Sequence, residues 1–219
     1  MSIKDAENEL FNQLKINNPA TTIVTDGIVD EKEYLESKYK ILYVMKEVNS
    51  DQNDGWSLTE FLSNGARSQT RDNIARWTEE ILNLEKDFDW EYLSGDNDLR
   101  RHKYLKKIAS INLKKTPGRH TSIYNEISMA TKNNKELIKK QVALYQPDII
   151  ICCGTSGLFA KYCLESGLTW QMTSRGIEYM ILDNTIIVSF SHPEARVADQ
   201  YLYYALIDAI REILEEYPV

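Results

Sequence analysis

Residues 40–50 constrain the fold most strongly, because an apolar run there stops abruptly at polar residues. The run consists of strand-forming residues and is too short for a helix: Ile41, Leu42, Tyr43, Val44 and Met45. Such a run is typical of a central strand in a parallel sheet that is buried on both faces. Glu47 and Asn49 follow it, and the carboxyl ends of such strands open onto the crevice where ligands bind. We therefore expect both side chains at that opening.

Length and charge bound the domain organisation and the partners. The chain of 219 residues suits one domain, and we expect residues 1–219 to form it, with residues 1–39 packing on it as a helical extension. The net charge of −7 argues against non-specific binding to nucleic acid, because such binding depends on neutralising phosphates. Any nucleic-acid site would therefore be local. The charged start lacks the apolar core of a leader segment, and no apolar run approaches membrane-spanning length. We expect a cytoplasmic protein without a membrane partner.

The three cysteines predict free, buried thiols. Cys152 and Cys153 are adjacent and Cys163 follows, which gives neither an even disulfide framework nor the Cys-x-x-Cys spacing of a zinc or iron–sulfur site. Neighbouring residues of a strand face opposite sides of the sheet, so both adjacent thiols would be small core residues. We expect no bound metal and no other cofactor.

Strand patterns alternate with helical patterns along the chain, which is typical of an α/β sandwich with a mainly parallel sheet. Strands are predicted at residues 41–45, 108–113, 148–153 and 185–190. Asp183-Asn184 predicts a hairpin between residues 178–182 and the last of these strands. Helices are predicted over residues 3–15, 30–35, 57–62, 74–84, 121–130, 135–145 and 198–217, with an irregular connection over residues 87–98.

Polar residues mark the ends of all four predicted strands. They are Glu47 and Asn49 after the first, Asn112 in the second, Gly154 and Thr155 after the third, and His192 after the fourth. Because the carboxyl ends of parallel strands meet at one edge of a sheet, these side chains are expected to converge. This expected convergence is the main sequence argument for a functional site.

Three of these residues have both a chemical and a structural interpretation. Glu47 would position a water molecule for acid–base chemistry, or serve as a helix cap or surface acid. Asn112 has donors and an acceptor with which to read the amide-like edge of a pyrimidine, or it caps the turn after its strand. His192, held by Pro193, would donate to negative charge developing on a leaving group, or belong to an ordinary turn.

The loop after the first predicted strand adds aromatic and acidic candidates. Trp56 and Phe61 would stack on a base, although aromatic residues beside a helix start are more often core. Asp51 and Asp54 lie in the same loop, and together with Glu47 they suggest a divalent metal site. A metal-dependent phosphoesterase is therefore a third interpretation of this region.

Basic residues form a positive island in this acidic chain. Its members are Arg100, Arg101, His102, Lys103, Lys106, Lys107, Lys114, Lys115 and Arg119. The island either binds phosphates or forms a solvated face, and the members at a strand end are the best placed for phosphate: Lys114, Lys115 and Arg119. Gly154 and Thr155 begin a turn whose amides would face an anion at a helix start, and Arg196 is a further phosphate candidate.

Several of these segments resemble motifs of one enzyme family. Residues 111–119, Ile-Asn-Leu-Lys-Lys-Thr-Pro-Gly-Arg, are similar to the stretch Asn-Val-Val-Lys-Cys-Arg-Pro-Pro-Gly-Asn-Arg of some members of the uracil-DNA glycosylase-like superfamily. Residues 46–50 occupy the place of its first motif, Gly-Glu-Ala-Pro-Gly or Gly-Gln-Asp-Pro-Tyr, in which Glu47 matches. Residues 147–154 look like its third strand, and His192-Pro193 like the start of its His-Pro-Ser motif. The resemblance covers roughly residues 40–196.

The resemblance implies a three-layer α/β/α sandwich around a central, mainly parallel four-stranded sheet. It also implies that Asn112 reads the base and that His192 stabilises the departing base. The sequence departs from the family where Lys46 and Asn49 replace glycine and proline, and where Glu194 replaces serine. An acid at position 194 would repel a phosphate. The four-cysteine iron–sulfur cluster of some members is absent.

Two functions from different classes follow. The first is a DNA glycosylase-like hydrolase that cleaves the N-glycosidic bond of uracil or a modified base, with DNA, single strands included, or a nucleotide as its partner. Glu47 and His192 would be catalytic, while Asn49, Trp56 and Phe61 would join Asn112 in binding the base. The alternative is a non-catalytic nucleotide- or nucleic-acid-binding module of the same fold.

Overall fold

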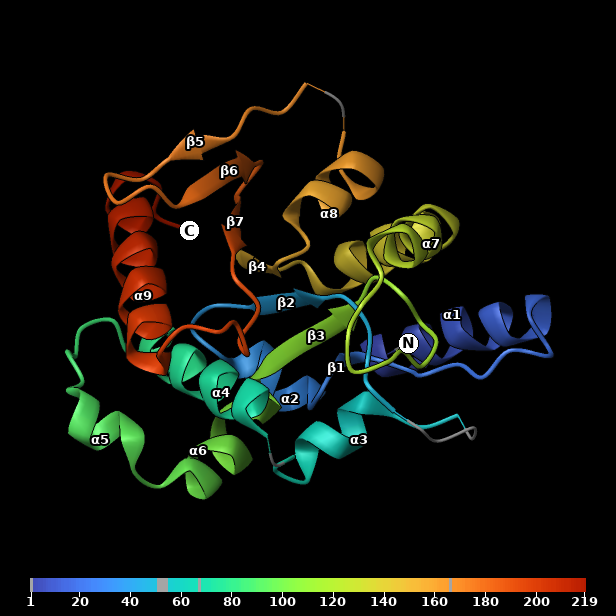
Figure 1. The fold of residues 1–219 in the computed structure, drawn as a ribbon, viewed down its shortest axis with the longest axis horizontal. Coiled ribbons are helices and arrows are strands. Elements are labelled where there is room, and N and C mark those ends of the chain that lie inside the picture. The colour runs from blue at the N-terminus through green and yellow to red at the C-terminus, as the bar shows by residue number, and fades with distance from the viewer. Residues whose placement is uncertain (1, 51–54, 67, 166) are drawn as a thin grey trace.

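A seven-stranded mixed sheet forms the centre of the fold (Figure 1). The computed structural model describes residues 2–50, 55–66, 68–165 and 167–219. Its strands are β1 (Gly27–Ile28), β2 (Ile41–Met45), β3 (Ile108–Asn112), β4 (Ile149–Cys153), β5 (Gln171–Met172), β6 (Glu178–Leu182) and β7 (Thr185–Phe190). Its helices are α1 (Ile3–Asn17), α2 (Glu31–Glu36), α3 (Leu58–Ser63), α4 (Gln69–Ile81), α5 (Trp90–Ser94), α6 (Asn97–Tyr104), the 3-10 turn η1 (Leu105–Lys107), α7 (Tyr124–Tyr145), α8 (Ser156–Cys163) and α9 (Asp199–Glu216).

The sheet has a parallel centre and antiparallel edges. Its strand order is β1-β3-β2-β4-β7-β6-β5, and the pairs β3-β2, β2-β4 and β4-β7 are parallel. β1 pairs antiparallel with β3, and β6 returns from β7 through the predicted hairpin at Asp183-Asn184. The predicted α/β class is confirmed, and the sheet has seven strands, of which the four parallel ones, β3-β2-β4-β7, lie inside it. The two-residue strands β1 and β5 are too short to leave a periodic pattern in the sequence.

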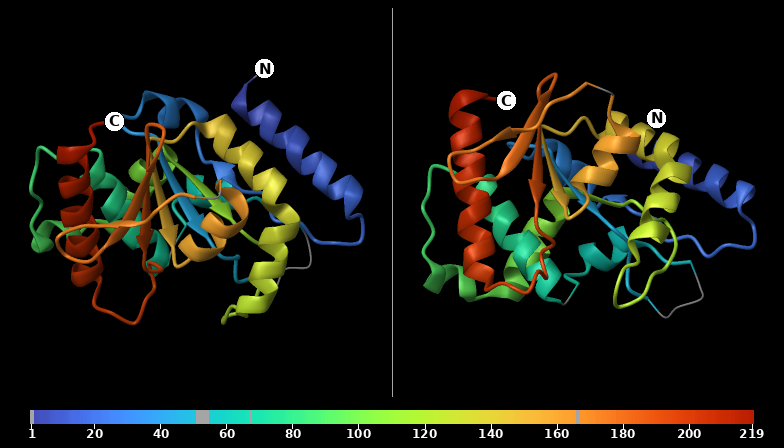
Figure 2. Two further views of the ribbon diagram at one scale, coloured as in Figure 1. Left: turned by 90° about the horizontal axis from the view of Figure 1, so that it is seen from above. Right: turned by 45° about the horizontal axis from the view of Figure 1, so that its top comes forward.

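β2 is the central strand that its apolar run predicts, with all five residues buried. Successive side chains face opposite sides of the sheet, so Leu42 packs in a cluster with Phe159 of α8, while Tyr43 packs on Trp77 of α4. Each fully buried side chain of this size contributes about 1.5–3 kcal/mol to folding. Helices α7 and α8 therefore cover one face of the sheet and α4 and α9 the other, with α1 lying outside α7 (Figure 2).

Several elements differ from the sequence prediction, among them α4, which begins at Gln69 rather than at residue 74. α7 is one continuous helix: between its two predicted halves, Lys132 and Asn133 are exposed, while Thr131 is buried and its hydroxyl donates to the carbonyl of Ile127 at 2.7 Å. The connection predicted as irregular contains α5, whose Asp89 cap accepts a hydrogen bond from the Tyr92 N–H. The N-terminal segment adds β1 to the sheet edge besides its helices.

The long helices are amphipathic. α9 buries Leu206 and Ile210 against the sheet and leaves Glu215 exposed. Among the described residues, no helix combines the length and the apolar character that crossing a membrane requires.

Candidate functional site

A cavity of about 540 Å³ lies at the carboxyl ends of β2 and β3, beside the segment that follows β7. Seven residues that the sequence predicted for the site line it: Glu47, Asn49, Trp56, Phe61, Asn112, Arg119 and His192. The parallel pairing of the four central strands carries these distant segments to one edge of the sheet. The structure thus brings Glu47, Asn112 and His192 to one cavity, while their chemical roles stay predictions.

Glu47 is held tightly on one side of the cavity. Its side chain is only 4% exposed, and its Oε2 accepts a hydrogen bond from Lys114 Nζ at 2.5 Å. The backbone of Gly118 covers the carboxylate so closely that a Cβ at position 118 would lie 2.0 Å from Glu47 Cδ. The Gly118 N–H donates to the carbonyl of Val48 at 2.7 Å, which fixes this approach. The carboxylate therefore has one orientation, set by an ammonium group and a glycine.

Asn112 presents a donor that lacks a partner. It is the last residue of β3 and is 2% exposed, and its backbone N–H donates to Asp26 Oδ2 at 2.7 Å. Its side-chain Nδ2 has no hydrogen-bond partner among the described residues. A buried donor left unsatisfied costs about 1–3 kcal/mol. An acceptor atom of a ligand in the cavity would remove that cost.

His192 is set up as a neutral donor. Burial lowers the pKa of His192, with Glu194 opposing the shift and Lys46 and Arg71 reinforcing it. The backbone N–H of Glu194 donates to His192 Nδ1 at 3.1 Å. Because Nδ1 acts as an acceptor, the proton of the neutral ring is on Nε2. The ring therefore offers an N–H at Nε2.

The two aromatic candidates combine both of their sequence interpretations. Trp56 and Phe61 meet edge to face, with ring centroids 5.7 Å apart and planes at 79°. Trp56 packs against the core yet lines the cavity, and its Nε1 has no partner among the described residues. Phe61 is 44% exposed. An aromatic surface is thus available to a ligand at this end of the cavity.

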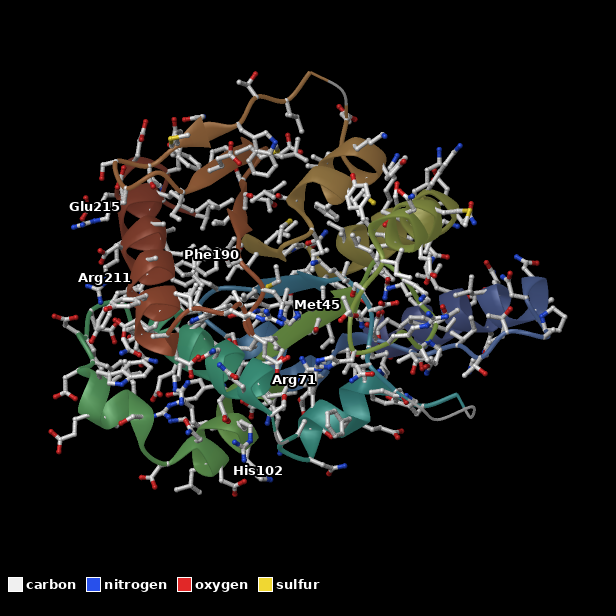
Figure 3. The ribbon with its side chains drawn as sticks, viewed as in Figure 1. Met45, Arg71, His102, Phe190, Arg211 and Glu215 are labelled. Carbon is white, nitrogen blue, oxygen red and sulfur yellow. The ribbon has the colours of Figure 1, made fainter. Side chains whose placement is uncertain are left out.

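The first turn of α4 adds residues that the sequence interpretation missed. Ser68, Thr70 and Arg71 line the same cavity. The burial of Arg71 lowers its pKa to about 10, with Glu194 and Cys153 opposing the shift. The available signal was the position of Arg71 itself, because a cation in the first turn of a helix opposes the helix dipole. Figure 3 shows Arg71 near Met45, at the end of β2.

The basic island is for the most part neutralised within the fold. Arg100 and Arg101 are buried, and each is paired with carboxylates: Arg100 with Glu79 at 2.6 Å, and Arg101 with Asp72 and Asp98. Lys107 pairs with Glu33 at 2.6 Å. Arg100 and Arg101 therefore do not belong to a solvated or phosphate-binding face, whereas His102 and Lys103 of the island are exposed. The charges of Arg100, Arg101 and Lys107 tie α6 and η1 to α4 and α2.

Among the phosphate candidates, Arg119 lines the cavity. The prediction that Lys115 binds a phosphate is wrong. Lys115 is 1% exposed, and its Nζ donates to both oxygens of Asp26 and to Gln141 at 2.7–2.9 Å. It cannot reach an external phosphate, because this network consumes all its donors. Lys114 is committed to Glu47 instead.

The remaining phosphate candidates lie outside the residues that line the cavity. The N–H of Gly154 donates to the carbonyl of Phe190 at 2.7 Å, and the hydroxyl of Thr155 donates to the carbonyl of Val44 at 2.8 Å. These groups hold the carboxyl ends of β2, β4 and β7 together. Arg196 is exposed.

The metal interpretation cannot be placed, because Asp51 and Asp54 lie outside the described residues. Within the described part of the chain, no group of three or more His, Cys, Asp or Glu side chains is arranged to hold a metal ion. The three cysteines are free and buried, as predicted. Burial raises the pKa of all three thiols, to about 11 for Cys163.

Comparison with known proteins adds no relative. The chain matches no protein-family model and no curated protein sequence. The functional argument therefore rests on the cavity.

Proposed function

We propose that the cavity is the active site of a hydrolase that cleaves the N-glycosidic bond of uracil or a modified base. The observation that carries this proposal is the meeting of a carboxylate, a carboxamide with a free donor and a neutral imidazole on one cavity that also has an aromatic wall. The parallel strands β3-β2-β4-β7 supply the first three groups, which supports a uracil-DNA glycosylase-like arrangement of the centre of the sheet.

The chemistry of the bond fits these groups. Cleavage leaves positive charge on the sugar and negative charge on the base, so catalysis requires groups of opposite character at the two ends. Water attacks the anomeric carbon, the electron pair of the carbon–nitrogen bond leaves with the base, and the carboxylate of Glu47 accepts a proton from the water. The proton then passes to the departed base, which balances the reaction. Lys114 acts as a positioning residue that fixes the Glu47 carboxylate.

The base would bind at the end of the cavity away from the Glu47 carboxylate. Asn112 carries both a donor and an acceptor on one side chain, which matches the paired carbonyl and N–H of a pyrimidine edge. The Nε2–H of His192 would donate to the base oxygen that gains negative charge. A neutral donor suits this role, because hydrogen bonding to a developing anion strengthens as the reaction proceeds. Trp56 and Phe61 would contact the face of the base.

A second candidate is a nucleotide-binding module without catalysis. It is favoured by the ion pair between Glu47 and Lys114 at 2.5 Å, since a carboxylate that already has a partner in the protein is less free to orient a water molecule. Both candidates use the same binding residues. Turnover separates them.

The test is release of free base from single- and double-stranded DNA that contains uracil, hypoxanthine or an oxidised pyrimidine, and from the corresponding nucleosides and nucleotides. We expect release of base without added metal from at least one of these compounds. Binding of a nucleotide without release from any of them would support the non-catalytic module. Activity abolished by a chelator and restored by a divalent ion would instead favour a phosphoesterase.

A further inference from the structure

The amino end of α4 opens onto the cavity and is not capped by its own side chain. Ser68 is the N-cap residue, yet it makes no side-chain capping hydrogen bond to the helix. Ser68 and Thr70 line the cavity beside this helix end. The first N–H groups of a helix lack partners within it, and with the positive end of the dipole they attract anions. The 13 residues of α4 give it a full dipole.

Arg71 adds a fixed positive charge to the same turn. Its Nε is buried and has no hydrogen-bond partner among the described residues, and the side chain lines the cavity next to His192 and Glu194. Glu194 favours the charged form of Arg71 without forming a direct ion pair with it, whereas the first turn of a helix disfavours a cation. A bound anion would satisfy the free Nε and compensate the charge. The fork of donors on a guanidinium matches the oxygens of a phosphate.

The buried side-chain atoms of the cavity lining that lack a partner among the described residues are all donors. They are Arg71 Nε, Asn112 Nδ2 and Trp56 Nε1, each buried and without a partner among the described residues. Asn112 is 2% exposed and lines the cavity. A ligand that fits the cavity therefore carries acceptors at two places: carbonyl oxygens near Asn112 and an anionic group near Arg71. The volume of about 540 Å³ lies within the range of small-molecule sites.

Three lysines that the sequence offered as phosphate ligands are committed to carboxylates. Lys114 is paired with Glu47 and Glu126, Lys115 with Asp26, and Lys107 with Glu33. A strand of nucleic acid needs a series of free cations for its flanking phosphates. The net charge of −7 repels such a strand further. The recognised anion is therefore on the ligand that enters the cavity.

We propose that the substrate of this site is a nucleoside monophosphate, whose phosphate binds at the first turn of α4 against Arg71 while its base binds at Asn112. This inference rests on the proposed function for the identity of the base end. A terminal phosphate carries more charge than the diester of a nucleic-acid strand and exposes three oxygens to the guanidinium, the helix N–H groups and the hydroxyls of Ser68 and Thr70.

Calorimetric titration tests the inference. The probes are uracil, deoxyuridine and deoxyuridine monophosphate, the same three forms of hypoxanthine, and a single-stranded oligonucleotide that contains uracil. In at least one series we expect the monophosphate to bind the wild-type protein at least about tenfold more tightly than the nucleoside, because hydrogen bonds to a charged group are stronger than those between neutral groups. Arg71→Gln should remove this difference and leave nucleoside affinity unchanged. Arg71→Lys should retain part of it.

The matched control is Arg175→Gln, because the Arg175 side chain is 70% exposed and pairs with Asp208. This variant should keep the full preference for phosphate. Equal binding of nucleoside and monophosphate in both series, a preference that persists in Arg71→Gln, or tighter binding of the oligonucleotide than of the monophosphate would each overturn the inference. An Arg71-dependent preference without base release would contradict only the proposed function. Base release without any phosphate preference would contradict only the inference.

Discussion

Two clusters of polar groups meet at Asn112, and they differ in whether their hydrogen bonds are complete. On one side, Lys115 Nζ donates to Asp26 at 2.8 and 2.9 Å and to Gln141 at 2.7 Å, in a fully buried network. On the other side, the cavity contains Asn112 Nδ2 and Arg71 Nε, which have no partner among the described residues. Asp26 joins the two clusters, because its Oδ2 also accepts the backbone N–H of Asn112.

The difference separates a structural cluster from a binding cluster. Buried polar groups are almost always paired in folded proteins, and the Lys115 network follows that rule with residues from three separate segments. The cavity breaks the rule at donors that line one wall, where a ligand can complete the hydrogen bonds. Two basic residues of one chain therefore have different roles: Lys115 stabilises the fold, and Arg71 belongs to the proposed anion-binding site.

The largest expected effect is on stability and tests the Lys115 cluster. Lys115→Met leaves Asp26 as a buried charge without its partner, so we expect the free energy of unfolding to fall by about 3–5 kcal/mol. Arg71→Met removes a partly buried cation that forms no direct ion pair among the described residues, so we expect a much smaller loss of stability than in Lys115→Met. Urea denaturation of the two variants against the wild type measures both. Lys32→Met is the control, because its side chain is 78% exposed.

The double variant Asp26→Asn with Lys115→Met should regain much of the stability, since no uncompensated charge remains. An equal loss in Lys115→Met and Arg71→Met would mean that Arg71 also has a structural partner, and the comparison between the clusters would fail.

The second effect is on turnover and tests the cavity. Glu47→Gln keeps the size of the side chain but removes its charge, and His192→Ala removes the donor for the departing base. If the proposed function holds, each should lower kcat by about 10²–10³-fold, because both groups act mainly in the transition state. KM or nucleotide affinity should change far less. Steady-state assays of base release measure these quantities.

Matched controls exist for both substitutions. Glu178→Gln and His102→Ala change exposed side chains outside the cavity lining, and both should keep wild-type turnover. A fall in affinity with unchanged kcat in Glu47→Gln or His192→Ala would assign these residues to binding alone. That outcome would favour the non-catalytic module.

The sequence predicted the elements that local pattern determines. The apolar run of β2 and the polar residues that follow it determine both the central strand and the position of Glu47 at its end. Asn112 and His192 reach the same cavity for the same reason, since parallel strands open at one edge. The edge strand β1 was missed because two residues carry no period.

Pairing between distant residues could not be predicted in this way. Lys114 and Lys115 look equivalent in sequence, yet they bind different carboxylates on different sides of the sheet end, Glu47 and Asp26. The partners lie 67 and 89 positions away along the chain, so only the folded arrangement selects them. Arg71 was missed for the complementary reason, because the absence of a partner is visible only once the neighbours are in place.

The smallest expected effect is on the pH dependence of stability, and it again compares the two clusters. Burial lowers the pKa of His192 below its ordinary value of 6.5, with Lys46 and Arg71 acting in the same direction and Glu194 against it. The folded protein therefore binds a proton at this site less readily than the unfolded chain does. As pH falls through about 6.5 toward the lower pKa of the folded state, the unfolded chain gains protons first. The contribution of neutral His192 to stability is thus present above this window and is lost on acidification.

His192→Gln removes this titration while keeping a polar side chain. We expect the free energy of unfolding of the variant to fall less steeply than that of the wild type as pH decreases through this window. The resulting difference in stability between the two proteins should be smaller than the loss in Lys115→Met. Urea denaturation at a series of pH values measures the slope. Other titrating groups contribute equally to both proteins, so the difference in slope isolates His192. His102→Gln should keep the wild-type slope, because that ring is 47% exposed and lies outside the cavity lining. An unchanged slope in His192→Gln would show that the ring is not held neutral by the cavity, and the donor role assigned to its Nε2 would then be wrong.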